Sequence, residues 1–217
     1  MTMSFDLGLM LVTDLRLAGG RPLEEIVASA VRGGITAVQL RDKGASTRAL
    51  LETALRILRL LEGTGIPLIV NDRADVALAA RAAGAHLGQA DLPAADARRM
   101  LGPEAVVGLS IETLEQAADI AADVVTYLGV SPVFATPTKA DASAPWGIAG
   151  LRALRERTAL PLVAIGGIHA GNAAEVLAAG ADGLAVVSAI CAAPAPEAAA
   201  RRLRGIVDAA RAEGRRR

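Results

Sequence analysis

The chain has 217 residues, of which 53% are apolar and 2% aromatic, and its 23 basic and 23 acidic residues give a formal net charge of zero. This length suits one large domain whose core is filled by Ala, Leu, Val and Ile. The even charge argues against nucleic-acid and membrane-surface partners, which usually need a basic patch. The lone Cys191 excludes an internal disulfide and lies in an apolar stretch typical of a buried thiol.

The N-terminal sequence lacks the charged start and cleavage site of a signal peptide, and no apolar run of about 18 residues appears. We therefore expect a soluble, cytoplasmic protein. No linker-like stretch divides the chain, so one domain is expected over residues 1–217, with residues 213–217 as a flexible basic tail.

Short runs rich in Val, Ile and Leu alternate along the chain with segments rich in Ala, Leu, Arg and Glu. We interpret the runs as strands buried on both faces and the segments as helices. The predicted strands are 9–13, 36–40, 67–70, 85–87, 105–109, 125–130, 161–165 and 183–187. The predicted helices are 22–33, 47–63, 73–83, 94–101, 112–122, 147–157, 171–179 and 194–212. This α/β alternation predicts a single-domain (β/α)8 TIM barrel, with an open doubly wound sheet as the alternative.

Helix-end signals support this division of the chain. Asn172 is a candidate for starting the seventh helix. Gly84 and Gly180 follow the third and seventh helices, where glycine accepts the left-handed conformation that ends a helix. No G-x-G-x-x-G motif opens the first helix, which argues against a dinucleotide-binding unit.

A barrel places functional residues just after the carboxyl ends of its strands. The second strand is followed by "QLRDK", in which Arg41 and Lys43 are two residues apart and point the same way in an extended chain. Two converging cations suit a phosphate-rich ligand. The alternative is a solvated cluster of ion pairs with Asp42.

Two carboxylates end neighbouring strands, Asp72 after the third and Asp91 after the fourth. Mg²⁺ is typically held by one or two carboxylates, with water and substrate phosphates completing its shell. The alternatives are a helix N-cap for Asp72 and a turn before a proline for Asp91. His86 has the pattern of an inward strand residue, and we favour a hydrogen-bonded core histidine over a metal ligand.

The later strand ends add hydroxyls and glycines. Ser110 ends the fifth strand and lacks a histidine–acid pair at recognisable spacing, so an anion donor fits it better than a nucleophile. Gly166, Gly167 and Ser188 follow the seventh and eighth strands, where this architecture often binds phosphate.

The stretch "VSPVFATPTKADASAPWG", residues 130–147, begins as a buried strand and then turns polar at Thr136, Pro137, Thr138 and Lys139. A surface turn is one interpretation. A loop that binds an anion is the other, and the cations, acids and glycines at the other strand ends favour it.

The segments "QLRDK", "VNDRADVALAARAAGAHLGQADLP", "GVSPVFATPTKADA", "AIGGI" and "GADGLAVVSAI" occur in the order and spacing of the thiamine-phosphate synthase family. The chain resembles this family from residue 11 to residue 190. The resemblance implies a TIM-barrel transferase that needs Mg²⁺. It would join 4-amino-5-hydroxymethyl-2-methylpyrimidine diphosphate to 4-methyl-5-(2-phosphoethyl)thiazole, or its 2-carboxy form, and yield thiamine phosphate and pyrophosphate.

The resemblance also implies roles for individual residues. The pyrimidine diphosphate would be held by Gln39, Leu40, Arg41, Asp42, Lys43, Asn71, Ser110 and Lys139. The thiazole phosphate would be held by Thr136, Pro137, Thr138, Gly167, Val187 and Ser188, and the Mg²⁺ by Asp72 and Asp91. Arg41, Lys43, Ser110 and Lys139 would be the catalytic residues. Asp42 stands where the family commonly has glutamate, which keeps the charge.

In this family the pyrimidine C–O bond breaks largely ahead of attack by the thiazole nitrogen, so a dissociative displacement is expected. Its partners would be two phosphorylated small molecules, with a homo-oligomer left open. Two alternatives remain at this point. One is a thiazole tautomerase on the same barrel, and the other is a catalytically silent phosphate-binding barrel.

Overall fold

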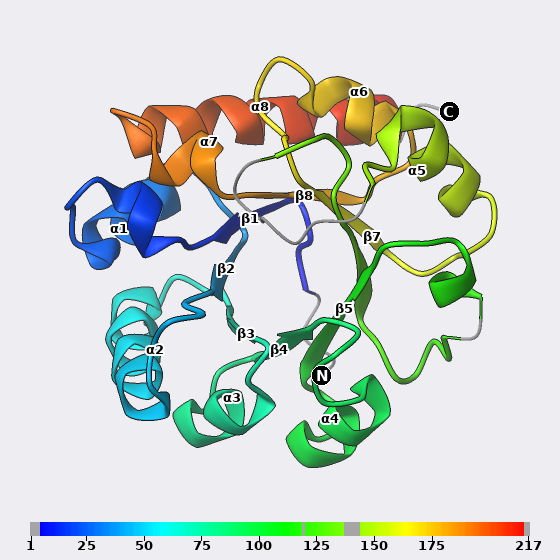
Figure 1. Cartoon of the computed structure of the whole chain (residues 1–217). Coiled ribbons are helices and arrows are strands. Elements are labelled where there is room, and N and C mark those ends of the chain that lie inside the picture. The colour runs from blue at the N-terminus through cyan, green and yellow to red at the C-terminus, as the bar shows by residue number, and fades with distance from the viewer. Residues whose placement is uncertain (1–4, 119, 137–143, 215–217) are drawn as a thin grey trace.

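The computed structural model describes residues 5–118, 120–136 and 144–214. In these residues eight parallel strands form a closed barrel, in which each strand pairs with the next and β8 returns to β1 (Figure 1). The strands are β1 Leu9–Val12, β2 Ala37–Leu40, β3 Leu68–Asn71, β4 Gly84–Leu87, β5 Val106–Ile111, β6 Tyr127–Val130, β7 Leu162–Ile165 and β8 Gly183–Val186. The predicted (β/α)8 barrel is confirmed.

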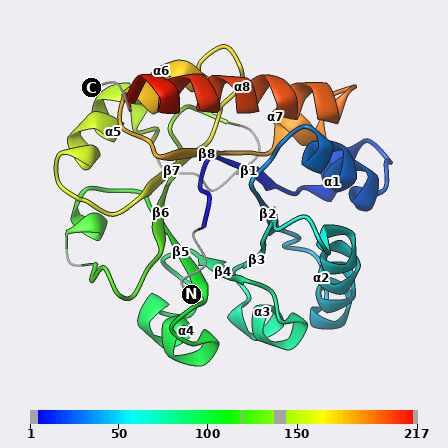
Figure 2. The same ribbon diagram turned by 180° about the vertical axis from the view of Figure 1, so that it is seen from behind.

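Helices surround most of the barrel, as the view from behind also shows, and between β5 and β6 the described residues contain only a short 3₁₀ helix (Figure 2). They are α1 Leu23–Arg32, α2 Thr47–Leu61, α3 Ala74–Ala80, α4 Ala94–Leu101, α5 Gly147–Arg155, α6 Ala173–Ala178, α7 Ser188–Cys191 and α8 Pro196–Gly214. Two 3₁₀ helices, η1 Leu15–Ala18 and η2 Glu115–Ala117, lie in loops. Within the described residues, no helix combines the length and apolar character needed to cross a membrane.

Three short elements differ from the prediction. The helix predicted over 112–122 is wrong for its described residues, which contain only η2. The Gln116 side-chain oxygen accepts hydrogen bonds from the backbone N–H groups of Glu112 and Thr113, and this closes a turn in place of a helical start. The sequence prediction also missed η1 and α7, which span four residues each and are too short for a periodic apolar pattern.

The predicted end of the third helix at Gly84 is also wrong. α3 ends at Ala80, and Arg81 takes the left-handed conformation with φ of 56°. Gly84 instead begins β4, where an added Cβ would lie 1.8 Å from the carbonyl oxygen of Val106 on β5. Glycine is required there because the two strands approach too closely for a side chain. Gly180 does follow α6 with φ of 108°.

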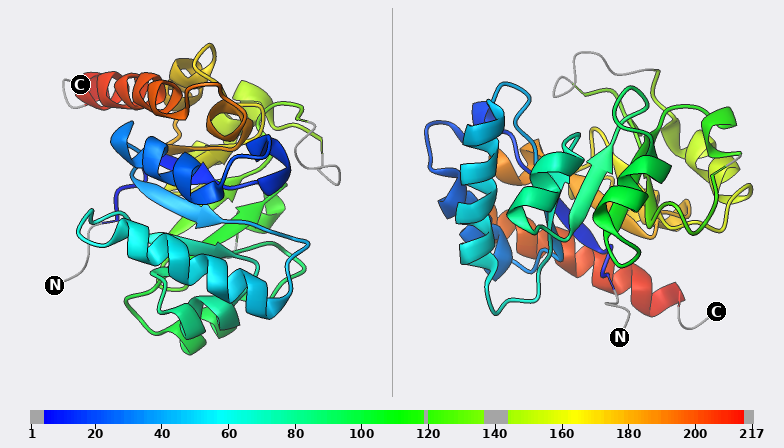
Figure 3. Two further views of the ribbon diagram at one scale, coloured as in Figure 1. Left: turned by 90° about the vertical axis from the view of Figure 1, so that its left-hand side faces the viewer. Right: turned by 90° about the horizontal axis from the view of Figure 1, so that it is seen from below.

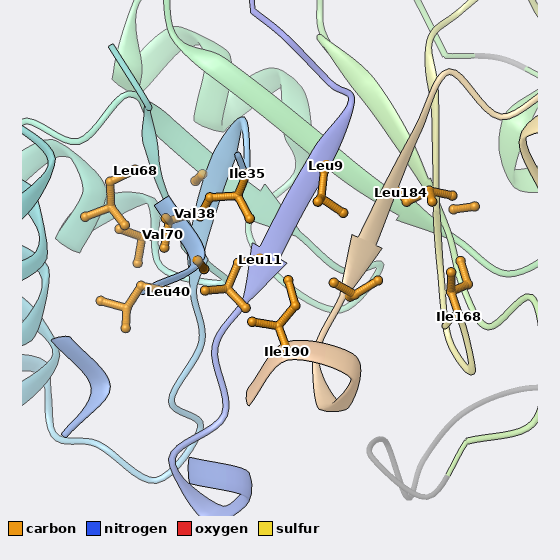
Figure 4. Packing of buried hydrophobic residues seen from close by; sticks show 14 of the residues in the cluster. Leu9, Leu11, Ile35, Val38, Leu40, Leu68, Val70, Ile168, Leu184 and Ile190 are labelled. Carbon is orange, nitrogen blue, oxygen red and sulfur yellow. The ribbon is translucent and has the colours of Figure 1, made fainter. Parts of the chain in front are cut away.

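The core forms two clusters because successive strand residues point to opposite faces. Outward residues such as Leu9, Leu11 and Val38 pack between the strands and the helices (Figure 4). Cys191 is buried in this outer cluster, as predicted. Inward residues such as Met10 and Ile69 fill the barrel interior. Truncating a large buried side chain of this kind to Ala costs about 2–5 kcal/mol.

The chain ends and the loops that follow the strands lie at opposite ends of the barrel. Both ends of the described chain lie on the side from which the strands start (Figure 3). Of the predicted basic tail, residues 213 and 214 belong to α8, and residues 215–217 lie outside the described residues. The loops that follow the strands gather at the opposite end, where the candidate site lies.

Candidate active site

A cavity of about 410 Å³ opens at the carboxyl ends of the strands. Its walls come mainly from inward-facing strand residues and the residues that follow each strand. The lining comprises Met10, Val12, Gln39, Arg41, Lys43, Asn71, Asp72, His86, Gly88, Gln89, Ala90, Asp91, Ser110, Glu112, Tyr127, Gly129, Ser131, Thr136, Val163, Ile165, Gly166, Gly167, Ile168, Ala185, Val186, Val187 and Ser188.

Arg41 is held in place by the end of the neighbouring strand β1. Its backbone N–H donates to the Thr13 hydroxyl at 2.9 Å, and its guanidinium donates to a carboxylate oxygen of Asp14 at 3.3 Å. The Asp14 side chain is only 3% exposed. Hydrogen bonds from Arg16, with the nearby Arg41 charge, hold the pKa of Asp14 below its usual value. An ionised Asp14 therefore fixes the Arg41 guanidinium beside the cavity.

Asp72 and Asp91 lie next to each other at the ends of β3 and β4. Asp72 has φ of 63°, an uncommon conformation for a residue with a side chain, and its N–H donates to the His86 carbonyl at 2.7 Å. One Asp91 carboxylate oxygen accepts a 2.6 Å hydrogen bond from the Gly88 N–H. Burial, and then the hydrogen bond and charge of Asp91, raise the pKa of Asp72 to about 6.

This acid pair fits a divalent cation. Two adjacent carboxylates repel each other when both are ionised, and a bound cation removes that cost while accepting oxygen ligands. Within the described residues, no group of three or more His, Cys, Asp or Glu side chains could hold a metal. Oxygens from water or ligand phosphates would complete the shell, as is usual for Mg²⁺.

The alternatives for the two acids fare differently. Asp72 is not the N-cap of α3, since Arg73 holds that position. Asp91 does close a turn, because its N–H also donates to the Gly88 carbonyl at 3.3 Å. The turn directs its carboxylate to the cavity wall, so the turn and metal interpretations of Asp91 are compatible.

The predicted core histidine is confirmed. His86 is 7% exposed, and its two ring nitrogens lie 2.9 Å from the Tyr127 hydroxyl and 2.8 Å from the Ser110 hydroxyl. In a catalytic triad, the second ring nitrogen of the histidine is bonded to a carboxylate. Here that nitrogen is bonded to the Tyr127 hydroxyl, so these contacts do not form a Ser–His–acid nucleophile.

On the opposite side of the cavity, the backbones of the loops after β6 and β7 approach each other closely. Gly166 and Gly167 follow β7 with φ of 101° and 65°. An added Cβ would lie 2.6 Å from Pro132 Cβ at the first glycine and 2.8 Å from Phe134 Cβ at the second. These glycines let the loop after β7 pack directly against the loop after β6, and the wall between them presents little side-chain bulk.

Residues 9–190 match a family model described as thiamine monophosphate synthase. The chain belongs to the thiamine monophosphate synthase family. The thiamine-phosphate synthase of Albidiferax ferrireducens is 61% identical over 203 residues, which cover 94% of this chain and 93% of that protein. That of Chloroflexus aurantiacus is 52% identical over 202 residues, which cover 93% of each. As a member of this family, the chain is an enzyme, a transferase that makes thiamine phosphate.

Solved structures agree with this family membership. A thiamine phosphate pyrophosphorylase from Pyrococcus furiosus superposes with a TM-score of 0.86 at 39% identity, covering 95% of this chain and 98% of that chain. A 3-hexulose-6-phosphate synthase superposes with a TM-score of 0.63 at 19% identity, covering 92% and 99%. The second likeness shows the shared barrel fold alone.

Most residues assigned from the family resemblance meet in the cavity. Those that line it are Gln39, Arg41, Lys43, Asn71, Asp72, Asp91, Ser110, Thr136, Gly167, Val187 and Ser188. Leu40 and Asp42 do not, because the strand alternation turns them away from the interior. Leu40 packs in the outer core, and the Asp42 carboxylate accepts from the Gly44 N–H at 3.1 Å. Pro137, Thr138 and Lys139 lie outside the described residues.

The sequence analysis missed several lining residues. Glu112 stands two residues after Ser110, and Gly129 two after Tyr127, so the period of two along a strand could have found both. Gln89 follows the fourth predicted strand, but the sequence analysis assigned it no role. It reaches across to donate to the Ser110 carbonyl at 2.7 Å, a contact that depends on the pairing of β4 with β5.

Proposed function

We propose that the cavity joins the pyrimidine diphosphate to the thiazole phosphate, or to its 2-carboxy form, and releases pyrophosphate. One observation carries the proposal: an acid pair, Asp72 and Asp91, lies in a single cavity beside the cations Arg41 and Lys43. Acids and cations gathered in this way suit a metal-bound diphosphate.

Asp72 and Asp91 would hold Mg²⁺. When bound, the ion supplies positive charge to the diphosphate, where negative charge grows as the pyrophosphate departs. Oxygen ligands and the mutual repulsion of the two acids support this assignment. The remaining positions around the ion would be taken by water and diphosphate oxygens.

Arg41 and Lys43 would bind oxygens of the diphosphate. Both would place positive charge where negative charge develops on the leaving group, and such electrostatic stabilisation is commonly the largest contribution to catalysis. The Ser110 hydroxyl would donate a further hydrogen bond to that group. Lys139, together with Pro137 and Thr138, belongs to the same proposal on the family resemblance alone.

The other substrate would lie toward the glycine wall. Gly167, Val187, Ser188 and Thr136 would surround the thiazole phosphate, with backbone N–H groups of the glycine turn as donors. Orienting the thiazole nitrogen toward the pyrimidine methylene carbon supplies much of the rate, because the reaction becomes effectively intramolecular.

A dissociative displacement suits this set of residues. The pyrimidine C–O bond breaks first, its electron pair leaves with the pyrophosphate, and the thiazole nitrogen then bonds to the methylene cation. No protein nucleophile and no strong general base are needed. The engagement of Ser110 with the His86–Tyr127 pair is consistent with a donor role for this serine.

Mixing the purified chain with both substrates and Mg²⁺, and following thiamine phosphate by mass spectrometry, tests the proposal. Product is expected with Mg²⁺ and is lost with EDTA. Absence of product with both substrates intact would refute it. Conversion of a thiazole carboxylate phosphate without the pyrimidine would identify a tautomerase, and binding without any conversion would identify a silent phosphate-binding barrel.

A further inference from the structure

Two rings lie stacked in the floor of the cavity, and the barrel makes room for them. The His86 and Tyr127 ring centroids are 5.4 Å apart with an interplanar angle of 24°. A Cβ added at Gly108 would lie 2.4 Å from His86 Nδ1 and 2.5 Å from the Tyr127 hydroxyl oxygen. One added at Gly129 would lie 2.7 Å from His86 Cε1. Two inward strand positions are thus free of side chains where these rings need the space.

The rings form a continuous hydrogen-bonded chain that ends at the cavity. The Tyr127 hydroxyl lies 2.9 Å from His86 Nδ1, and His86 Nε2 lies 2.8 Å from Ser110 Oγ. With a neutral imidazole the chain has two directions. Either Tyr127 donates to Nδ1 and Nε2–H donates to Ser110, or Nδ1–H donates to Tyr127 and Ser110 donates to Nε2.

The surroundings of Tyr127 favour the first direction. Burial raises the pKa of Tyr127, so its hydroxyl keeps its proton at neutral pH. The Gln39 side chain also hydrogen-bonds Tyr127 in the sense that lowers the tyrosine pKa, so it donates to the hydroxyl oxygen and does not take the proton. Besides Nδ1, that proton can reach the Met10 sulfur at 3.9 Å, which is a weak acceptor and already accepts from Gln39 Nε2 at 3.4 Å. The ring nitrogen is nearer and stronger, so the tyrosine donates to it.

We propose that Tyr127 and His86 are positioning residues that hold the Ser110 hydroxyl proton toward the cavity, ready for an anionic oxygen. Since Nε2–H donates to Ser110 Oγ, the serine proton must point elsewhere, and the cavity lies in front of it. The second direction would instead turn that proton into the floor. The proposal rests on the proposed function in one respect, namely that the anion Ser110 meets is the diphosphate.

The protein is well suited to a direct test of this hydrogen-bonded chain, because its sequence contains only two histidines and one tyrosine. Uniform ¹⁵N-histidine labelling gives signals from two imidazole rings, each with two nitrogens. The variant His169→Gln, at an exposed loop position, assigns the signals of each ring. At neutral pH, His86 is expected to show a protonated Nε2 and an unprotonated Nδ1. A protonated Nδ1, as the other tautomer or as imidazolium, would overturn the proposal. This measurement uses the unaltered floor, so it does not depend on any variant folding there.

Tyr127→Phe then tests the consequence for Ser110. Removing the hydroxyl is expected to bring a population with protonated Nδ1 and to weaken binding of inorganic pyrophosphate with Mg²⁺ by about three- to tenfold. In a Ser110→Ala background the same substitution is expected to have no further effect on binding. A merely structural role for Tyr127 would leave its full effect in that background and overturn the proposal.

Met10→Leu is the matched control for the direction of the chain. It removes the competing sulfur and is expected to leave the His86 tautomer unchanged. A shift from protonated Nδ1 in the wild type to protonated Nε2 in Met10→Leu would show that the sulfur takes the Tyr127 proton in the wild type, against the proposal. Failure of thiamine phosphate formation would refute the proposed function but would leave the tautomer result standing, so the two outcomes can be told apart.

Discussion

The two sides of the cavity differ in the residues that the strands contribute to them. At the carboxyl ends of β2 to β5, the cavity is lined by polar side chains such as Gln39, Asn71 and Ser110. On β7, β8 and β1 the inward residues are apolar, as in Val163 and Ala185, and the loop after β7 adds glycine. Among the described residues that line the cavity, the charged side chains therefore lie on one wall, and the other wall is formed by apolar side chains, glycine and hydroxyls.

The two walls are also stabilised differently. Three polar groups on the charged wall are each held by a neighbour: Arg41 by Asp14, Asp91 by the Gly88 N–H, and Ser110 by His86. The apolar wall depends on close backbone approach. Substitutions on the charged wall should therefore lower the rate with little change in stability, and substitutions on the other wall should lower stability.

Asp91→Asn should give the largest loss on the charged wall. It keeps the size of the side chain and removes one of the two charges proposed to hold Mg²⁺. We expect kcat to fall by about 10²–10³-fold, the usual cost of removing a strong electrostatic contribution to the transition state. Steady-state rates across a Mg²⁺ titration measure it. Asp96→Asn, on the outer helix α4 beside Arg99, is the matched control and should change kcat less than about twofold.

Gly166→Ala should give the largest loss on the other wall. With φ of 101° and only 2.6 Å from the new Cβ to Pro132 Cβ, we expect a destabilisation of about 1–3 kcal/mol. Urea unfolding measures it. Gly205→Ala is the control, since this glycine lies within α8 with no atom within 4 Å of an added Cβ. It should stabilise the protein by about 0.5–1 kcal/mol. Equal effects at both sites would contradict the packing argument.

Asp14→Asn should have an intermediate effect, through Arg41. The amide cannot pair with the guanidinium as a carboxylate does, so Arg41 is less well fixed beside the cavity. We expect kcat/KM for the pyrimidine diphosphate to fall about tenfold, equal to about 1.4 kcal/mol of transition-state stabilisation. Asp208→Asn, which breaks an exposed pair with Arg204 on α8, is the control. An unchanged kcat/KM in Asp14→Asn would show that Arg41 needs no such support.

The alternation of strand and helix, and the polar residues at strand ends, could be predicted because both are local properties of the sequence. The sequence could also have predicted which residues face away from the cavity. Leu40 and Asp42 lie in the family motif, but the period of two along an extended chain turns them away from it. The support of Arg41 by Asp14 could not be predicted, since it depends on how β1 pairs with β2. The helix predicted over 112–122 does not form in the described residues, where the Gln116 side-chain oxygen accepts a hydrogen bond from the Glu112 N–H. A pattern of apolar residues does not reveal such a contact.

The smallest expected effect is a pH dependence that belongs to the acid pair. In the metal-free protein the pKa of Asp72 is about 6, above the 3.8 of a free side chain. Between these values the folded state holds a proton that the unfolded state releases, so this carboxyl stabilises the fold at low pH. That stabilisation is lost as the pH rises from about 4 to about 6. Since the side chain is partly exposed, the change should be on the order of 1 kcal/mol.

Urea unfolding with EDTA, compared between the wild type and Asp72→Asn, isolates this contribution, because other carboxyls such as Asp14 titrate in both proteins. Asparagine also tolerates the left-handed backbone at this position. The wild type should lose more stability than the variant between pH 4 and pH 6. Added Mg²⁺ should stabilise the wild type more at pH 7 than at pH 5, because a proton on Asp72 competes with the ion. The same pH slope in both proteins would show that the pKa of Asp72 is not raised in the folded state, and would remove one reason for placing a cation at the acid pair.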